Sequence, residues 1–397
     1  MEFSNLISDK MLGVKASAIR EIFKVAGKPD VISFAGGLPA PESFPVADIK
    51  AICNDILDNE PITALQYGIS EGYAPLKELV LKRMKEKEGI GRENDDIIIV
   101  SGSQQGCDLT AKVLLNEGDG VICEEPSFIG CLNTFRTYNA KLYGVPMNED
   151  GMDLAVLEET LKNHNNIKLI YTIPTFQNPS GITSSLAVRK GMLELAQKYN
   201  VMILEDNPYG ELRFSGEKIP TIKSMDTTGN VIYLGSFSKV FSPGLRLAYL
   251  IMDKGIMEKI VVGKQATDVH TNVFSQMIAA RYLKDYNIDE SIETSRKLYK
   301  HRCHLMLSCM DQYFPENVSY TRPDGGIFIW VTLPEGVDTG KLMLEAVERK
   351  VAFVPGNAFM TDLDKPSHCF RLNYSTMSDE KIEKGIKILG DLLKERL

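Results

Sequence analysis

The chain has 397 residues, a length that exceeds what one hydrophobic core usually serves, and a formal net charge of −8. The negative charge argues against nucleic acid as the main partner, and no apolar run approaches the roughly 20 residues that a membrane-spanning helix needs. The N-terminus lacks the apolar core of a signal peptide, the seven cysteines include no CxxC pair, and the five histidines show no metal-ligand spacing. We therefore expect a cytoplasmic, metal-free protein of two lobes with reduced, mostly buried thiols.

Residues 1–45 combine a helix-like arm with the Gly- and Pro-rich segment FAGGLPAPESFP. From about residue 95, short apolar runs alternate with helical patterns such as GCDLTAKVLLN. Apolar runs without polar alternation are typical of strands buried on both faces, and helices between them indicate a mostly parallel sheet. The runs lie at 96–106, 120–126, 168–181, 201–210, 231–239 and 245–252. Because the last two are too close together for a helical crossover, we expect one of them to be antiparallel.

After about residue 290 the pattern changes to a long helical stretch, followed by the segments GGIFIWVTL, VAFVPGNAF and CFRLNYS. This order indicates a smaller α+β lobe that the N-terminal segment completes. We therefore predict an α/β protein in three parts. These are an N-terminal arm with part of the small domain at 1–45, a large domain at 46–290, and a C-terminal small domain at 291–397.

Polar and aromatic residues follow several of the predicted strands, at the edge where open α/β sheets bind ligands. Ser103 precedes a helix, and this position suits either an anion site or a plain N-cap. Asp206 ends a buried strand and needs a partner, either a ligand or an arginine from a neighbouring loop. Asn178 lies in a polar turn that turn chemistry alone would also explain, and Phe128 stands where a loop should be polar.

The segment 231–250 is unusual because a lysine, Lys239, follows a core strand beside the hydroxyls of Ser236 and Ser238. A lysine in such a place either pairs with another group or takes part in catalysis, as Schiff-base nucleophiles do. Arg246, seven residues on, offers a planar fork suited to a phosphate. Together with the strand-end groups, these residues describe a ligand with a phosphate, a basic ring nitrogen, a phenolic oxygen and an aldehyde.

Six motifs resemble, in sequence and order, those of the fold-type-I pyridoxal-phosphate enzymes, and within them the class I/II aminotransferases. They are LQYGISEGYAPLKE, SGSQQG, PTFQNPSG, EDNPYGELRF, SFSKVFSPGLRLAYL and FRLNYS, and they span nearly the whole chain. The segment VKASAIREIF further resembles the branch that contains 2-aminoadipate, kynurenine and aromatic aminotransferases. The resemblance implies the three-layer, aspartate-aminotransferase-like fold and the cofactor pyridoxal 5′-phosphate. It also implies transfer of an amino group between an L-amino acid and a 2-oxo acid.

The resemblance assigns catalytic roles to Lys239, Asp206 and Tyr209, and makes Asn178 a cofactor- and substrate-binding residue. Lys239 would hold the cofactor as an aldimine and then carry a proton between the substrate Cα and the cofactor. Asp206 would pair with the pyridine nitrogen and keep it protonated, which makes the ring an electron sink. Asn178 and Tyr209 would hydrogen-bond the phenolic oxygen of the ring.

Further residues would bind the cofactor. Phe128 would stack on the ring, a position where many relatives have tyrosine. Tyr67 would reach the phosphate from a neighbouring subunit, so the resemblance implies a homodimer with shared active sites. The phosphate would be held by Ser103, Gln104, Ser236, Ser238 and Arg246.

The resemblance also implies the substrate contacts. Arg371 would clamp the α-carboxylate beside Asn178, and Gly37 would allow close approach of the backbone. Ser17 and Arg20 would lie on a mobile helix over the site, where Arg20 would meet the distal carboxylate of glutamate or 2-aminoadipate. The alternative is that Arg20 is an ordinary surface arginine of an amphipathic helix. We expect 2-oxoglutarate and glutamate as one substrate pair, with 2-aminoadipate, aromatic or aliphatic amino acids as the other.

Two other functions remain open at this point. A C–S lyase or another eliminating enzyme of this fold would share Lys239 and Asp206, but it would release ammonia without a keto-acid acceptor. The effector-binding domain of a transcription regulator would share the fold as well. The chain begins almost directly at the arm and has no basic patch, so we expect no DNA-binding domain.

Overall fold

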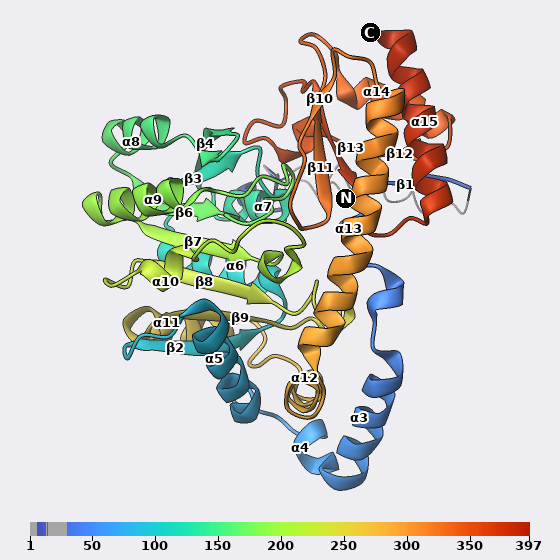
Figure 1. Cartoon of the computed structure of the whole chain (residues 1–397). Helices are drawn as coiled ribbons and strands as arrows, with labels where there is room; N and C mark the ends of the chain where they lie inside the picture. Colours follow the sequence, from blue (N-terminus) through green and yellow to red (C-terminus); the bar gives the residue numbers. More distant parts are fainter. Residues whose placement is uncertain (1–5, 13, 15–29) are drawn as a thin grey trace.

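The computed structural model describes residues 6–12, 14 and 30–397, and its centre is an eight-stranded sheet (Figure 1). The strand order is β2-β9-β8-β7-β6-β3-β4-β5. The bounds are β2 Asp95–Val100, β3 Gly120–Glu125, β4 Lys141–Asn148, β5 Gly151–Met152, β6 Ile167–Thr172, β7 Met202–Asn207, β8 Val231–Ser236 and β9 Ala248–Asp253. Every apolar run that was predicted as a strand is therefore a strand of this sheet.

The directions of the strands agree with the lengths of the connections between them. Strands β4, β3, β6, β7 and β8 are neighbours in this order, and each pairs in parallel with the next. Strand β9 pairs antiparallel with both β8 and β2. The expected antiparallel strand is thus β9. Strand β4 was not predicted, because its sequence KLYGVPMN contains Gly and Pro and most of its side chains are partly exposed.

Helices cover both faces of the sheet, which gives three layers (Figure 1). Successive residues of a strand pack on opposite faces of the sheet. Val121 and Cys123 pack on the face of α6 and α7, and Ile122 packs on the face of α8 and α9. One face carries α6 Ser103–Leu114, α7 Ile129–Thr137 and α11 Lys254–Gln265. The other carries α5 Ala74–Glu88, α8 Leu154–Asn163, α9 Leu186–Lys198, α10 Ile222–Met225 and α12 Val273–Asp285. Burial on both faces explains why the strands are continuously apolar.

A smaller antiparallel sheet lies beyond the large one, with the order β10-β11-β14-β13. N-terminal strand β1 (Ile32–Ser33) pairs in parallel with β12 (Val351–Ala352), which brings residues from the two ends of the described chain together. The helix α13 (Ile288–Tyr313) runs from α12 to α15 (Asp379–Arg396) and links the lobes (Figure 1). The proposed boundary at 290/291 falls near the start of this helix, and we retain the three-part division as a proposal.

The remaining elements complete this second lobe and the N-terminal region. They are α1 Asp9–Leu12, α3 Val46–Asn59, α4 Pro61–Leu65, β10 Ser319–Tyr320, β11 Phe328–Thr332, α14 Thr339–Glu348, β13 Val354–Pro355 and β14 Cys369–Asn373. None of the described helices combines the length and the apolar composition that crossing a membrane requires.

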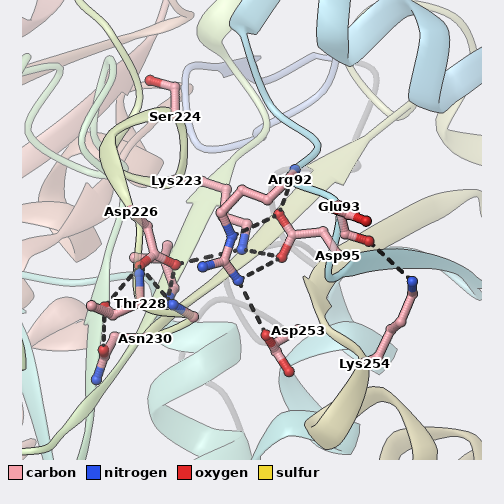
Figure 2. A network of polar contacts seen from close by, with 12 residues as sticks. Arg92, Glu93, Asp95, Lys223, Ser224, Asp226, Thr228, Asn230, Asp253 and Lys254 are labelled. Carbon is pink, nitrogen blue, oxygen red and sulfur yellow. Dashed lines mark hydrogen bonds and ion pairs between the residues drawn. The ribbon is translucent and has the colours of Figure 1, made fainter.

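A polar network closes the edge of the large sheet at which the parallel strands begin (Figure 2). Lys223 Nζ donates to Asp95 Oδ1 at 2.9 Å, and both side chains are fully buried. Arg92 Nη2 bridges Asp95 and Asp253, the last residue of β9, at 3.0 and 3.2 Å. Asp226 accepts from the backbone N–H of Val231, where β8 begins, at 3.1 Å. These pairs tie α10 and three strands together at the edge opposite the strands' carboxyl ends, which leaves the carboxyl edge for ligands.

Candidate active site

A cavity of about 370 Å³ opens at the carboxyl edge of the large sheet, between it and the second lobe. It gathers twelve residues that the sequence singled out: Gly37, Ser103, Gln104, Phe128, Asn178, Asp206, Tyr209, Ser236, Ser238, Lys239, Arg246 and Arg371. These residues come from segments that are up to 334 positions apart, as Gly37 and Arg371 are. The strand ends, the start of α6 and the small lobe therefore meet at one pocket.

One end of the cavity suits an anion. Helix α6 begins after Gly102, whose φ is 81°, and no side chain caps its first turn. A Cβ at Gly102 would lie 2.2 Å from Arg246 Nη2, so only glycine lets this guanidinium lie across the helix N-terminus. Ser236 and Ser238 lie in the same pocket, where the Ser236 Oγ accepts from the Ser238 N–H at 3.1 Å. The helix dipole, the guanidinium and these hydroxyls form a cradle for a phosphate.

The helix cap settles one of the open alternatives. Gly102, and not Ser103, is the N-cap residue, so the hydroxyl of Ser103 is not used to cap α6. The side chain of Gln104 is turned toward α7, where its Nε2 donates to the Gly130 carbonyl at 3.0 Å. Gln104 can therefore offer an anion its backbone N–H, but not its amide group.

Asp206 is a buried carboxylate with one oxygen satisfied and one oxygen free. Tyr171 Oη donates to Asp206 Oδ2 at 3.0 Å, and Oδ1 has no hydrogen-bond partner. Burial, and to a smaller extent the nearby charge of Glu124, raise the pKa of Asp206 to about 7 against the opposing effect of the Tyr171 hydrogen bond. A buried, orphaned carboxylate oxygen that faces a cavity is suited to a cationic N–H donor on a ligand.

Lys239 lies across the cavity, and its Nζ donates to the carbonyl of Gly37 at 2.5 Å. Burial, together with the positive charges of Arg371 and Arg246, lowers its pKa to about 8. A much larger share of the amine is therefore neutral and nucleophilic near neutral pH than in a solvent-exposed lysine. Gly37 also packs closely, because a Cβ there would lie 3.1 Å from the ring of Phe328.

Arg371 is held in one orientation by the surrounding groups. Its Nη1 donates to Asn178 Oδ1 and its Nη2 to the Ala35 carbonyl, both at 2.7 Å. The rings of Phe328 and Phe359 lie 4.1 and 4.9 Å from its Cζ. Its Nε is buried without a partner, and burial lowers its pKa to about 10. This guanidinium is fixed, charged and incompletely satisfied, which suits a ligand carboxylate.

A hydrogen bond links two predicted residues of the cavity, Asn178 and Tyr209. Asn178 Nδ2 donates to Tyr209 Oη at 3.4 Å, and burial raises the pKa of the tyrosine hydroxyl. Tyr209 therefore stays protonated at neutral pH and can donate its own hydrogen to a ligand oxygen. Phe128 borders the cavity as the N-cap residue of α7, which places an aromatic ring at its wall.

Among the predicted site residues that the structure describes, Tyr67 is the one outside the cavity. The side chain of Tyr67 is 83% exposed and packs edge-on against His270. Arg20 and Ser17 lie outside the described residues. The cavity of one chain thus contains the predicted cofactor contacts except the one assigned to a neighbouring subunit.

The expectation of reduced cysteines is wrong for one pair, because Cys107 and Cys131 form a disulfide. They are 24 residues apart in the sequence, and adjacent helices α6 and α7 bring them together. Spacing rules for CxxC pairs detect neighbours in the chain, so they miss neighbours across two helices. The other five cysteines are free.

Sequence reasoning also missed Tyr171, which holds Asp206. A tyrosine within an apolar strand is ordinary β-sheet composition, so nothing in the run marks its hydroxyl as a partner for a carboxylate. The only sequence signal for this role is the position of Tyr171 within its strand. Tyr171 pairs with Leu204 on the adjacent strand, two residues before Asp206, and both Tyr171 and Leu204 face the same core.

The family model described as aminotransferase class I and II matches residues 30–389. The chain belongs to the class I and II aminotransferases. Across its whole length the aminotransferase is 43% identical to "Aromatic-amino-acid aminotransferase 1" of Thermococcus litoralis, of which it covers 96%. It is 40% identical to "2-aminoadipate transaminase" of Thermus thermophilus over 96% of its own length and 94% of that protein's.

A solved structure agrees with this assignment. The Pyrococcus horikoshii kynurenine aminotransferase, in complex with PMP, is 42% identical with a TM-score of 0.96, covering 100% of this chain and 98% of that one. The aminotransferase therefore has the aspartate-aminotransferase-like fold and is a pyridoxal-phosphate enzyme. Its own residues fit the cofactor: a phosphate cradle that a Cβ at Gly102 would fill, and a buried carboxylate oxygen, Asp206 Oδ1, that lacks a partner. Family and fold favour amino-group transfer over the lyase and effector-domain alternatives.

Proposed function

We propose that this aminotransferase moves the amino group between an aromatic, aliphatic or 2-aminoadipate-type L-amino acid and a 2-oxo acid, with 2-oxoglutarate and glutamate as one pair. The observation that carries the proposal is the oriented, incompletely satisfied guanidinium of Arg371 beside the Lys239 amine. A carboxylate bound there would place the α-carbon and α-amino group next to that amine. The names of the relatives support the aromatic and 2-aminoadipate-type amino acids of this range.

The cofactor, when bound, supplies an aldehyde that takes up the amino group and a protonated ring that withdraws electrons from the substrate Cα. Arg246, Ser236, Ser238 and the start of α6 would hold its phosphate, and the ring nitrogen would face Asp206 Oδ1. Asn178 and Tyr209 would bind its phenolic oxygen. Phe128 would cover one face of the ring.

Lys239 is the proposed acid and base. Its pKa of about 8 leaves the amine able both to accept a proton from the substrate Cα and to return one. Asp206 would keep the ring nitrogen protonated, because its own oxygens lie in a buried site where a neighbouring positive charge is favourable. Arg371 would fix which bond at Cα points toward the amine.

The substrate range beyond the α-carboxylate rests on the N-terminal helix of the family. We retain Arg20 as the residue that would meet a distal carboxylate and Ser17 as its neighbour at the site. Gly37, whose carbonyl accepts from Lys239, would be the backbone contact closest to the substrate. Cytoplasmic location is likewise retained from the sequence pattern.

We also propose that the aminotransferase acts as a homodimer. Exposed apolar side chains gather on α3, α4 and the segment after them; they include Val46, Ile62, Leu65, Tyr67 and Ile69. A patch of this kind on one side of a monomer indicates a covered surface. A second copy seated there would bring its Tyr67 to the phosphate cradle, which the chain's own Tyr67 does not reach.

Half-reactions test the proposed chemistry directly. Purified protein that carries the cofactor is mixed with single L-amino acids, and the visible absorbance of the bound cofactor is followed. Aromatic amino acids, 2-aminoadipate and glutamate should each discharge the absorbance, and 2-oxoglutarate should restore it. Ammonia release without a keto acid would instead support a lyase, and normal turnover by Lys239→Ala would overturn the proposal.

A further inference from the structure

The disulfide between Cys107 and Cys131 lies directly beside the carboxylate of Asp206. Both cysteines are buried, with exposed fractions of 0% and 1%, and their Cα atoms are 6.1 Å apart, within the range of protein disulfides. The two sulfur atoms and an Asp206 oxygen all lie within 4.8 Å of one another. A disulfide has no thiolate to offer a metal ion, so this group is a redox pair next to a carboxylate.

The pair joins the two helices that border the cofactor site. Cys107 lies one helical turn after Ser103, where α6 presents its free N–H groups. Cys131 lies three residues after Phe128, the aromatic residue at the cavity wall. Apart from the disulfide, Gln104 is a second tie between these helices, through Gly130 at 3.0 Å. The covalent bond therefore fixes the phosphate-binding helix against the helix that positions the ring-stacking residue.

Reduction would also change the polar surroundings of Asp206. The disulfide carries no hydrogen, and Asp206 Oδ1 has no partner in this form. Two thiols at the same place would be two weak S–H donors whose sulfur atoms lie within 4.8 Å of an Asp206 oxygen. Reduction would therefore place two polar hydrogens beside the carboxylate that is proposed to bind the cofactor's ring nitrogen.

We propose that Cys107 and Cys131 are a redox-active pair that sets the affinity for the cofactor, high in the disulfide form and low in the dithiol form. Oxidation transfers two electrons and two protons from the thiols to a low-molecular-weight disulfide, which leaves as two thiols while the S–S bond forms. Reduction reverses each of these steps. The inference rests on the proposed placement of Asp206 at the ring nitrogen.

Thermodynamic linkage gives the proposal a second consequence. If the disulfide raises the affinity for the cofactor by some factor, then the bound cofactor must make the disulfide harder to reduce by the same factor. The two effects can be measured independently. Agreement between them distinguishes coupling from a general loss of structure.

The first experiment counts thiols in protein purified without reductant. Denaturation in iodoacetamide followed by intact mass analysis should show five alkylated cysteines, matching the five free ones, and seven after treatment with a water-soluble phosphine. The phosphine takes up the oxygen of one water molecule, and the two sulfurs take up its hydrogens. Seven alkylated cysteines before reduction would overturn the proposal.

The second experiment measures affinity for pyridoxamine 5′-phosphate, which has no aldehyde that a reductant could attack. The dissociation constant should rise roughly fivefold or more on reduction, the lower end of ordinary allosteric coupling. In mixtures of oxidised and reduced dithiothreitol, the same ligand should shift the midpoint toward more reducing mixtures by an equal factor. Equal affinities of the two forms would overturn the proposal.

Matched variants complete the test. Cys107→Ala and Cys131→Ala should show no response to reductant, whereas Cys123→Ala, which removes an equally buried but unpaired cysteine, should keep it. Transamination at saturating cofactor is measured in parallel with both redox forms. Activity without a difference in affinity would refute this inference and leave the proposed function standing, whereas inactivity of both forms would refute the proposed function.

Discussion

At the scale of single residues, Arg371 shows how a buried charge can be kept for a ligand. Two fixed acceptors, Asn178 and the Ala35 carbonyl, orient its guanidinium, and two aromatic rings cover its faces. Its unpartnered Nε shows that these contacts do not use all of its donors. A planar, bidentate carboxylate would complete them.

Arg371→Lys tests this geometry. Lysine keeps the positive charge but has no rigid fork, so we expect kcat/KM for amino acids to fall on the order of 100-fold, mostly through KM. Steady-state kinetics with glutamate and an aromatic amino acid would measure the loss. Arg322→Lys is the control, because Arg322 is exposed and pairs with Asp311 away from the cavity. A change of less than twofold at Arg371 would contradict the assignment.

The pKa of Lys239 predicts how the cofactor-free protein takes up pyridoxal phosphate. At a pKa of about 8 roughly half of the amine is neutral at pH 8, whereas an ordinary lysine would be under about 1% neutral. The rate of uptake should therefore rise with pH around a midpoint near 8, as followed by stopped-flow absorbance. A midpoint near 10 would contradict the burial and the charge repulsion described for this side chain.

The same shift has a defined sign for stability. Because the folded-state pKa of Lys239 is lowered, the unfolded chain binds more protons between about pH 8 and 10.5. The contribution of this group to the stability of the cofactor-free protein therefore increases as the pH rises through that window. Below pH 8 the free-energy cost of burying the protonated amine is fully present.

Much of the site could be predicted from sequence because its residues interrupt apolar runs. Asp206, Asn178 and Lys239 are polar where a buried strand ends, and that contrast is visible in one dimension. Tyr171 and Cys107 carry no such contrast, since they are common in buried strands and helices. Their roles depend on which strands and helices become neighbours in space. A local sequence pattern does not show which residues of separate elements are close in space.

At the scale of elements, the start of α6 depends on a glycine for two separate reasons. Gly102 has a φ of 81°, and its missing side chain makes room for Arg246. Gly102→Ala should therefore lower the affinity for the cofactor by about tenfold or more, because Arg246 must move from the cradle as the backbone is strained. Equilibrium titration with pyridoxamine 5′-phosphate would measure this change.

Gly118→Ala is a matched control for the backbone effect. Gly118 has a φ of 83°, but no atom lies within 4 Å of the position of a Cβ there. Both variants should lose a similar amount of thermal stability, on the order of 1 kcal/mol, while only Gly102→Ala loses affinity for the cofactor. Equal affinities in the two variants would show that Arg246 does not depend on this glycine.

The elements themselves differ in how readily sequence predicts them. Strands buried on both faces, such as β7 and β8, are uniformly apolar and are recognised from that pattern. Strand β4 is partly exposed and contains Gly144 and Pro146, so neither alternation nor continuity marks it. Its place in the sheet is determined by parallel pairing with β3, a tertiary effect that outweighs local propensity.

At the scale of the whole molecule, contacts within one chain do not cover the exposed apolar patch on α3 and α4. Ile62 and Leu65 are 78% and 75% exposed, and Tyr67 follows them at 83%. Water contact of this much apolar surface is unfavourable, by about 25 cal/mol for each square ångström. A two-fold interface would bury the patches against each other and carry each Tyr67 to the partner's cavity.

The double substitution of Ile62 and Leu65 by glutamate should therefore convert a dimer into monomers, because charges would be buried at the interface. Size-exclusion chromatography with light scattering would show the mass of one chain in place of two. Affinity for the cofactor should fall in the same variant, since its phosphate would lose the contact from the partner subunit. Leu344→Glu, at a residue 61% exposed on α14, is the control and should leave both properties unchanged. A monomeric variant that binds the cofactor as tightly as the native protein would show that each site is complete within one chain.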